Sequence, residues 1–309
     1  MPVDPQIQRL LEARAKLPAI HTLSIADART LMAAREVPGL RKPALADVRE
    51  QVIDGPGGAL RLRIYTPLGQ GPFPLMVFFH GGGFVLCSLD THDGLARNLC
   101  AGAACVVVSV DYRLAPEHKF PAGIDDCLAA TRWVAAHAGV LNGDAGRIMV
   151  AGDSAGGNFA AVTALRARDE GGPALCGQML IYPVTAHYSA ALPSMTSNGE
   201  GYGLTHDGMR YYWDHYLNHD DEGEDACAAP LRAASLAGLP PALVATAEYD
   251  PLRDEGEEYA MALVRAGVPV AMQRWLGVNH GFFFFPGVVD KATAAVDDAC
   301  SWARAVFAR

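Results

Sequence analysis

Short and nearly continuous apolar runs recur along this chain, and they constrain its fold more than any other feature. The run Leu75–Phe79, for example, reads LMVFF. Apolar residues at every position are typical of strands that are buried on both faces of a mostly parallel sheet. The predicted strands, several of which are such runs, are Leu60–Pro67, Phe73–His80, Ala104–Asp111, Arg147–Asp153, Cys176–Pro183, Ala242–Glu248 and Val268–Trp275.

Helical patterns occupy most of the intervals between these strands. They cover Thr91–Ala103, Pro121–Ala138, Ser154–Asp169, Arg253–Ala266 and Val289–Ala308. Regular alternation of strands and helices predicts an α/β fold, in which helices cover both faces of an open sheet.

Two segments, residues 1–45 and 184–235, do not extend this alternation. The first predicts a helix with an apolar face and a second helix over Ala26–Ala34, and the later segment predicts a helix over Thr205–Leu217 with Thr205 as N-cap. The apolar face consists of Ile7, Leu10, Leu11 and Leu17. We expect both segments to form a cap over the carboxyl edge of the sheet, where α/β folds bind ligands. Residues 46–183 and 236–309 would then be the two parts of the core.

Charge and cysteine content limit the partners and the compartment. The formal net charge is -9, which disfavours nucleic acid and anionic lipid as partners. The seven cysteines are scattered and form no C-x-x-C pair, so they suggest neither a disulfide framework nor a zinc site. We see no secretory signal and no apolar run of the ~18 residues that a spanning helix needs. These features predict a cytoplasmic protein without stable membrane association.

The strongest chemical motif is Gly152-Asp153-Ser154-Ala155-Gly156, a G-x-S-x-G pattern. It follows a predicted strand and begins a predicted helix, which is the setting of a nucleophile elbow. The sharp turn requires small flanking residues, and it places the hydroxyl of Ser154 at a helix N-terminus that favours developing negative charge. The alternative is a glycine-rich turn with a serine N-cap.

A second glycine motif, His80-Gly81-Gly82-Gly83-Phe84, follows another predicted strand. Consecutive glycines leave backbone amides uncovered, and such amides can bind an oxyanion. A phosphate-binding loop is the rival interpretation, but the P-loop spacing and its lysine are missing.

A serine nucleophile needs a histidine base and a carboxylate that orients the base. Of the histidines after Ser154, only His280 lies just past a predicted strand; the others fall in the expected cap and are His187, His206, His215 and His219. Asp250 lies at the end of the strand Ala242–Glu248 and is the preferred acid. Asp254 is the competitor, with a helix N-terminus as its alternative role.

Together these motifs resemble those of the bacterial hormone-sensitive-lipase-like (family IV) carboxylesterases of the α/β-hydrolase superfamily. The matching motifs are HGGGF at His80–Phe84, DYRLAPE at Asp111–Glu117, GDSAGGN at Gly152–Asn158, DPLRD at Asp250–Asp254 and HGF at His280–Phe282. The resemblance extends over about residues 48–309.

The resemblance implies an α/β-hydrolase fold with an eight-stranded, mostly parallel sheet and a helical cap. It implies Ser154, Asp250 and His280 as the catalytic triad, with no cofactor and no metal. It further implies that the amides of Gly82, Gly83 and Ala155 form the oxyanion hole. His80 would support the glycine loop, while Arg113 and Glu117 would tie loops together. Family members are often homodimers.

The expected substrate is a small ester with a short to medium acyl chain. Aromatic residues that could line the pocket, or equally pack in the core, are Phe84, Tyr182, Tyr188, Trp213 and Phe282. The triad also permits an amidase or a lactonase. A non-catalytic ligand receptor on the same fold is disfavoured because His280 is present.

Overall fold

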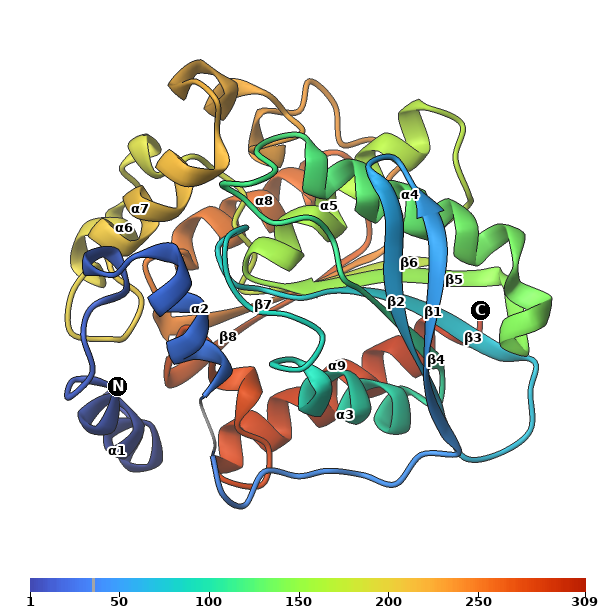
Figure 1. The fold of residues 1–309 in the computed structure, drawn as a ribbon, viewed down its shortest axis with the longest axis horizontal. Helices are drawn as coiled ribbons and strands as arrows, with labels where there is room; N and C mark the ends of the chain where they lie inside the picture. The colour runs from blue at the N-terminus through green and yellow to red at the C-terminus, as the bar shows by residue number, and fades with distance from the viewer. Residues whose placement is uncertain (35–36) are drawn as a thin grey trace.

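The computed structural model describes residues 1–34 and 37–309, which contain one eight-stranded sheet with the strand order β1-β2-β4-β3-β5-β6-β7-β8 (Figure 1). The strands are β1 (Asp47–Gly55), β2 (Gly58–Thr66), β3 (Phe73–Phe79), β4 (Val106–Val110), β5 (Gly143–Asp153), β6 (Gly177–Ile181), β7 (Ala242–Tyr249) and β8 (Val270–Asn279). Strands β3 to β8 are parallel, whereas β1 and β2 add an antiparallel edge. The predicted α/β fold with a mostly parallel sheet is confirmed.

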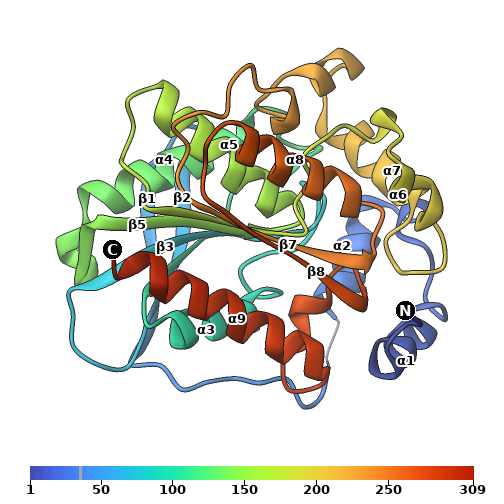
Figure 2. The ribbon, with the colours of Figure 1, turned by 180° about the vertical axis from the view of Figure 1, so that it is seen from behind.

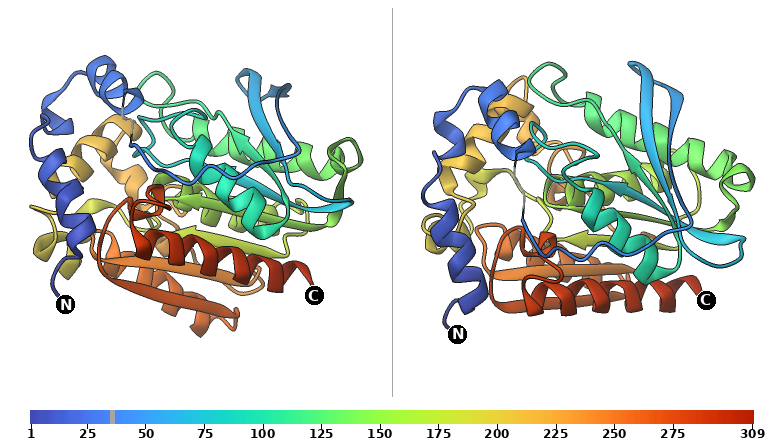
Figure 3. Two further views of the ribbon diagram at one scale, coloured as in Figure 1. Left: turned by 90° about the horizontal axis from the view of Figure 1, so that it is seen from below. Right: turned by 60° about the horizontal axis from the view of Figure 1, so that its bottom comes forward.

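Helices cover both faces of the sheet, as the alternation predicted. They are α1 (Pro5–Arg14), α2 (Ile25–Ala33), α3 (Asp93–Ala103), α4 (Ala122–Ala136), α5 (Ala155–Asp169), α6 (Pro193–Ser197), α7 (His206–Tyr216), α8 (Arg253–Arg265) and α9 (Asp290–Phe307). Helices α3 and α9 lie on one face, and α4, α5 and α8 lie on the other (Figures 2 and 3).

Two hydrophobic cores result, one on each side of the sheet. In β3, Leu75, Val77 and Phe79 point into the core under α4 and α5, while Met76 and Phe78 point into the core under α3 and α9. All five side chains are fully buried. This two-sided burial is the physical reason for the continuous apolar runs in the sequence.

Strand β1 is the strand that the apolar runs did not reveal. Its residues are mostly exposed, and Ile53 is the one fully buried residue among them. The strand pairs only with β2, at the edge of the sheet. An edge strand with a solvated surface does not need the continuous apolar run that marks several of the other strands.

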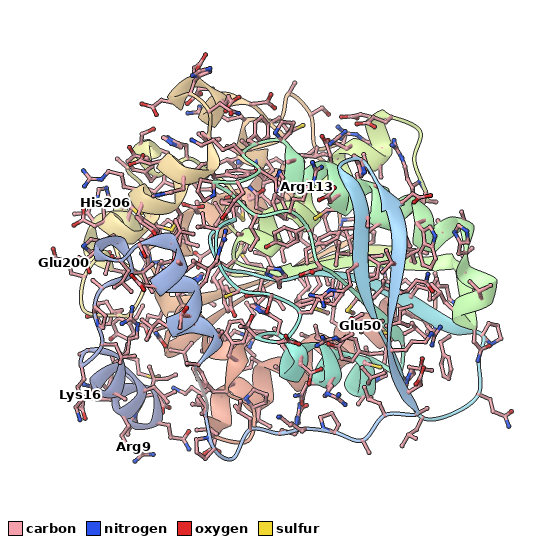
Figure 4. The ribbon with its side chains drawn as sticks, in the orientation of Figure 1. Arg9, Lys16, Glu50, Arg113, Glu200 and His206 are labelled. Carbon is pink, nitrogen blue, oxygen red and sulfur yellow. The ribbon has the colours of Figure 1, made fainter. Side chains whose placement is uncertain are left out.

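Four helices that do not cover the sheet gather beyond one of its ends. Helices α1 and α2 from the N-terminus lie beside α6 and α7 (Figure 1). Thr205 caps α7 as expected, because its side chain accepts the Gly208 N–H at 3.0 Å. The outer side of this group is polar, with Arg9, Lys16, Glu200 and His206 exposed (Figure 4).

Candidate active site

The turn that carries Ser154 is tight enough to require glycine at two positions. Ser154 has φ 57° and ψ -120°, between the end of β5 and the start of α5. A Cβ atom at Gly152 would collide with the carbonyl of Gly156, and one at Gly156 would collide with the carbonyl of Phe79. The glycines therefore let α5 pack against β3, and the turn holds the Ser154 side chain at the carboxyl edge of the sheet.

Ser154, His280 and Asp250 form one hydrogen-bonded chain. His280 Nε2 lies 2.9 Å from Ser154 Oγ, and His280 Nδ1 lies 2.7 Å from Asp250 Oδ2. The three residues follow β5, β8 and β7, parallel strands of one sheet whose carboxyl ends lie at the same edge, with β6 between β5 and β7. With Nδ1–H donated to the carboxylate, the Nε2 lone pair faces the hydroxyl and can accept its proton.

The turn that holds Asp250 is fixed from two sides. Its Oδ1 accepts the Leu252 N–H at 2.8 Å, within its own turn. From the 184–235 segment, the Asn198 side-chain amide donates to the carbonyls of Asp250 and Glu248, both at 3.1 Å. Ser194 Oγ donates to the Pro251 carbonyl at 2.7 Å. Residues of α6 and Asn198, which follows it, thus hold the turn that carries Asp250, a role that no local motif at Asn198 suggests.

The glycine loop after β3 presents uncovered amides near Ser154. Gly82 and Gly83 have φ values of 125° and 61°, a region that favours glycine. Among the residues that the structure describes, their N–H groups donate to no protein acceptor. Both residues line the same cavity as Ser154 and His280. Ala155 is the first residue of α5, where a helix leaves its N–H free.

His80 lies behind this loop and is fully buried. Its ring stacks on Tyr112 with centroids 4.3 Å apart, and Nδ1 donates to the Gly81 carbonyl at 2.8 Å. The Tyr112 hydroxyl donates to the His80 carbonyl at 2.6 Å. Burial lowers the pKa of His80 to about 3, so its ring is neutral at neutral pH. His80 is therefore placed to support the loop, and it lies outside the cavity lining.

A cavity of about 740 Å³ opens above Ser154 and His280. Its walls come from the glycine loop, the α1–α2 segment, α7 and the turn after His280. The cavity volume falls within the roughly 300–1,000 Å³ usual for small-molecule sites. Apolar wall residues include Leu10, Leu11, Ile20, Met32, Val184, Leu204, Met209 and Phe285.

The five aromatic residues considered for the pocket divide into two groups. Phe84 lines the cavity, with its ring stacked on Tyr216 at 3.9 Å. Within the described part of the chain, the cavity lining does not include the other four, Tyr182, Tyr188, Trp213 and Phe282. Tyr182, Trp213 and Phe282 are buried in the cores, and Tyr188 packs against His187. Tyr182 still contacts the site, since its ring centroid lies 4.6 Å from that of His280.

The aromatic residue of α7 that faces the cavity is Tyr212, which sequence reasoning missed. Its ring lies against Gly83, where a Cβ atom would collide with it. Trp213 lies about 100° further around the helix and packs on Phe84. A helical wheel places Tyr212 and Trp213 on different faces of α7, but it does not show which face meets the cavity.

Two salt bridges attach neighbouring loops to this site. Arg113 binds Asp126 through Nε and Nη2, both at 2.8 Å. Arg29 of α2 binds both carboxylate oxygens of Glu117 at 2.7 Å and also donates to the carbonyls of Val85 and Ala115. Arg29 lowers the pKa of Glu117 to about 2. Arg29 therefore links the N-terminal helices to the loop that follows the glycines.

Neither a metal centre nor a membrane span emerges from the described residues. Residues 1–34 and 37–309 hold no group of three or more His, Cys, Asp or Glu side chains that could bind a metal ion. None of the helices in these ranges has the length and apolar character that crossing a bilayer requires. All seven cysteines lie in the described residues, and none of them forms a disulfide.

Known proteins resemble this chain in both sequence and fold. A family profile described as the alpha/beta hydrolase fold matches residues 76–284. The esterase LipI of Mycobacterium tuberculosis is 44% identical over 301 residues, which cover 96% of this chain and 92% of that protein. The carboxylesterase NlhH of the same organism is 47% identical over 238 residues, covering 76% of this chain and 74% of that protein. A solved hyperthermophilic esterase from Pyrobaculum calidifontis superposes with a TM-score of 0.92 at 40% identity and 99% coverage of both chains.

Proposed function

We propose, from the premise that the chain belongs to the alpha/beta hydrolase fold family and its hormone-sensitive-lipase-like branch, that it is a serine carboxylesterase. Its substrates would be esters with short to medium acyl chains. The observation that supports this most is the chain Ser154–His280–Asp250, with distances of 2.9 and 2.7 Å, at the floor of a cavity.

In the first half of the reaction, Ser154 Oγ attacks the ester carbonyl while His280 Nε2 takes the hydroxyl proton. The carbonyl oxygen becomes an oxyanion, and the amides of Gly82, Gly83 and Ala155 would donate to it. His280 then gives the proton to the leaving alcohol. In the second half, water adds to the acyl-enzyme with the same proton transfers, and the carboxylic acid leaves. Asp250 keeps His280 in the required tautomer and stabilises the imidazolium.

The preference for short and medium chains rests on the cap. We propose that residues 1–45 and 184–235 form it over the two core parts, residues 46–183 and 236–309. The cavity is closed on that side by Leu10, Ile20, Met32 and Tyr212. A walled cavity of about 740 Å³ limits the length of a bound chain. The charged and polar side chains exposed on the outer side of the cap, such as Arg9, Lys16 and Glu200, disfavour docking on lipid.

Initial rates on p-nitrophenyl acetate, butyrate, octanoate and palmitate test the proposal, with Ser154→Ala as the paired variant. We expect turnover of the first three esters, little of palmitate, and no turnover above background by the variant. Matched ester and amide substrates separate an esterase from an amidase, and lactones test the remaining alternative. Rates that increase steadily up to palmitate, or an active Ser154→Ala variant, would contradict the proposal.

We also propose a cytoplasmic homodimer that binds neither nucleic acid nor membranes. Cysteines that form no disulfide among the described residues suit a reducing compartment. The edge strand β8 and the adjacent α8 expose apolar side chains, namely Met261, Val264, Met272 and Leu276. An unpaired strand edge with apolar neighbours favours self-association. Light scattering coupled to size exclusion should give twice the chain mass; a monomer at high concentration would refute the dimer.

A further inference from the structure

The amide of Gly81, one residue before the proposed oxyanion donors, is held by two side chains. Its N–H lies 3.0 Å from Asp153 Oδ1 and 3.1 Å from His92 Nε2. Asp153 ends β5 directly before Ser154, and His92 directly precedes α3. Both side chains are buried, at 1% and 2% exposure. Two elements that are distant in sequence therefore converge on one backbone N–H.

The hydrogen bonds around His92 fix its tautomer. The Thr91 hydroxyl lies 2.9 Å from the Ser88 carbonyl, which can only accept, so its single hydrogen points there. Thr91 Oγ1 also lies 2.9 Å from His92 Nδ1. With the hydroxyl hydrogen on the Ser88 carbonyl, Nδ1 is the donor to Thr91 Oγ1, and the Nε2 lone pair faces the Gly81 N–H. Nε2 also lies 3.3 Å from Asp153 Oδ1, which accepts the same N–H.

The position of the His92 ring is set by packing as well as by these bonds. The ring of Phe284, in the turn after His280, meets it edge-on at a centroid distance of 4.7 Å. A Cβ atom at Gly81 would collide with the Asp153 carboxylate, so the backbone approaches that side chain as closely as glycine permits. The Gly81 amide thus has little freedom to move.

We infer that His92 and Asp153 are positioning residues for ester hydrolysis, which hold the Gly81 amide and thereby orient Gly82 and Gly83 before the oxyanion forms. The inference rests on the proposed function, because it assigns those two amides to the oxyanion hole. Glycine peptides are flexible, and an oxyanion hole is effective only when its donors are fixed in advance. The His80 ring donates to the Gly81 carbonyl and the Tyr112 hydroxyl donates to the His80 carbonyl, so hydrogen bonds hold both peptides that flank the Gly81 Cα.

The test compares His92→Leu with His92→Gln. Leucine removes the acceptor, whereas the glutamine carbonyl can replace Nε2 as acceptor for the Gly81 N–H. We expect His92→Leu to lower kcat about 10- to 100-fold with KM changed less than about twofold, because misplaced donors weaken transition-state stabilisation only. His92→Gln should recover most of the loss. Binding of an alkyl boronic acid, which mimics the tetrahedral state, should weaken in proportion to kcat.

Two further measurements keep the outcome decisive. His187→Leu and His187→Gln are matched controls at a buried histidine outside the cavity lining, and both should keep the wild-type kcat. Hydrogen exchange of a peptide covering residues 80–86 should be faster in His92→Leu than in the wild type, whichever substrate the enzyme uses. If the wild type hydrolyses no ester, the proposed function fails, and exchange alone decides on the positioning role. Unchanged kcat and exchange in His92→Leu, or a glutamine variant no better than leucine, would overturn the inference.

Discussion

At the scale of single residues, the two carboxylates considered as the partner of His280 have distinct surroundings. Asp250 is fully buried and accepts from His280 Nδ1 and the Leu252 N–H. Asp254 instead accepts from Arg253 Nε at 2.7 Å and from the Ser194 N–H at 2.8 Å. It therefore stabilises the start of α8 and its contact with α6. The two acids are only four positions apart in the sequence, but their different hydrogen-bond partners give them different roles.

Asparagine substitutions at these two acids should consequently have very different effects. Asp250→Asn removes the acceptor that fixes the His280 tautomer, so kcat should fall on the order of 10⁴-fold, as in the comparable serine-protease substitution. Asp254→Asn should change kcat less than about threefold and lower stability slightly. Steady-state kinetics on one butyrate ester measure both. Equal losses in the two variants would contradict the assignment of Asp250.

The catalytic candidates could be predicted from sequence because each follows a strand directly. Ser154, Asp250 and His280 come after β5, β7 and β8, whose carboxyl ends meet at one edge. Local motif and fold topology together bring them close. His92 and Asn198 could not be predicted in this way, because their roles depend on where a loop and a short helix pack.

At the scale of elements, α7 decides the shape of the cavity through Tyr212. The Tyr212 side chain lines the main cavity and also a second cavity of about 270 Å³. Leu11, Ile20 and Leu204 line both cavities as well. These side chains therefore form a thin partition. Apolar residues on the far side include Ala15, Leu17 and Ala19, which would suit an alkyl chain.

Replacing Tyr212 with alanine should join the two cavities and admit longer acyl chains. We expect the ratio of kcat/KM for octanoate to that for butyrate to rise several-fold. The ring also packs against Gly83, so both absolute rates should fall, but the ratio cancels that common loss. The neighbouring Tyr211→Ala is the control, since Tyr211 lies outside the lining of both cavities. An unchanged ratio in Tyr212→Ala would show that the partition does not limit chain length.

Secondary structure was predictable wherever burial imposes a pattern. Strands β3 to β7 were found because both of their faces are covered, whereas the solvated edge strand β1 was not. Helix α7 was recognised from Thr205 and its periodicity. The face of α7 that lines the cavity could not be predicted. The residue spacing shows which side chains share a face of the helix, but tertiary packing determines which face meets the cavity. This is why Trp213 was considered for the pocket and Tyr212 was missed.

At the scale of the whole molecule, the buried Glu255 joins the core to the start of the 184–235 segment. Its Oε1 accepts the Thr185 N–H at 2.8 Å and the Ala186 N–H at 3.3 Å. Burial raises the pKa of Glu255 to about 8, because the charged carboxylate loses its hydration; the two backbone N–H groups offset only part of this. The folded protein therefore favours the protonated form of this side chain.

The raised pKa predicts how stability depends on pH. An unfolded glutamate titrates near 4.5 and the folded one near 8, so the folded state binds the extra proton between these values. The free energy of unfolding contributed by Glu255 should thus decline as pH rises from about 4.5 to 8. Glu255→Gln keeps the acceptor without the charge, so its stability relative to wild type should increase across that window. Denaturant titrations at several pH values measure the difference; a constant difference would contradict the prediction.

Ester hydrolysis by this triad passes through a covalent acyl-enzyme at Ser154, and rapid acid quenching followed by peptide mass spectrometry detects that intermediate directly. The protein is mixed with p-nitrophenyl butyrate, quenched during the first turnovers and digested. We predict a butyryl group on the peptide that contains Ser154, absent from Ser154→Ala and from unreacted protein. Ester hydrolysis with no acylated peptide, or with the butyryl group on another side chain, would contradict the assignment of Ser154 as the nucleophile.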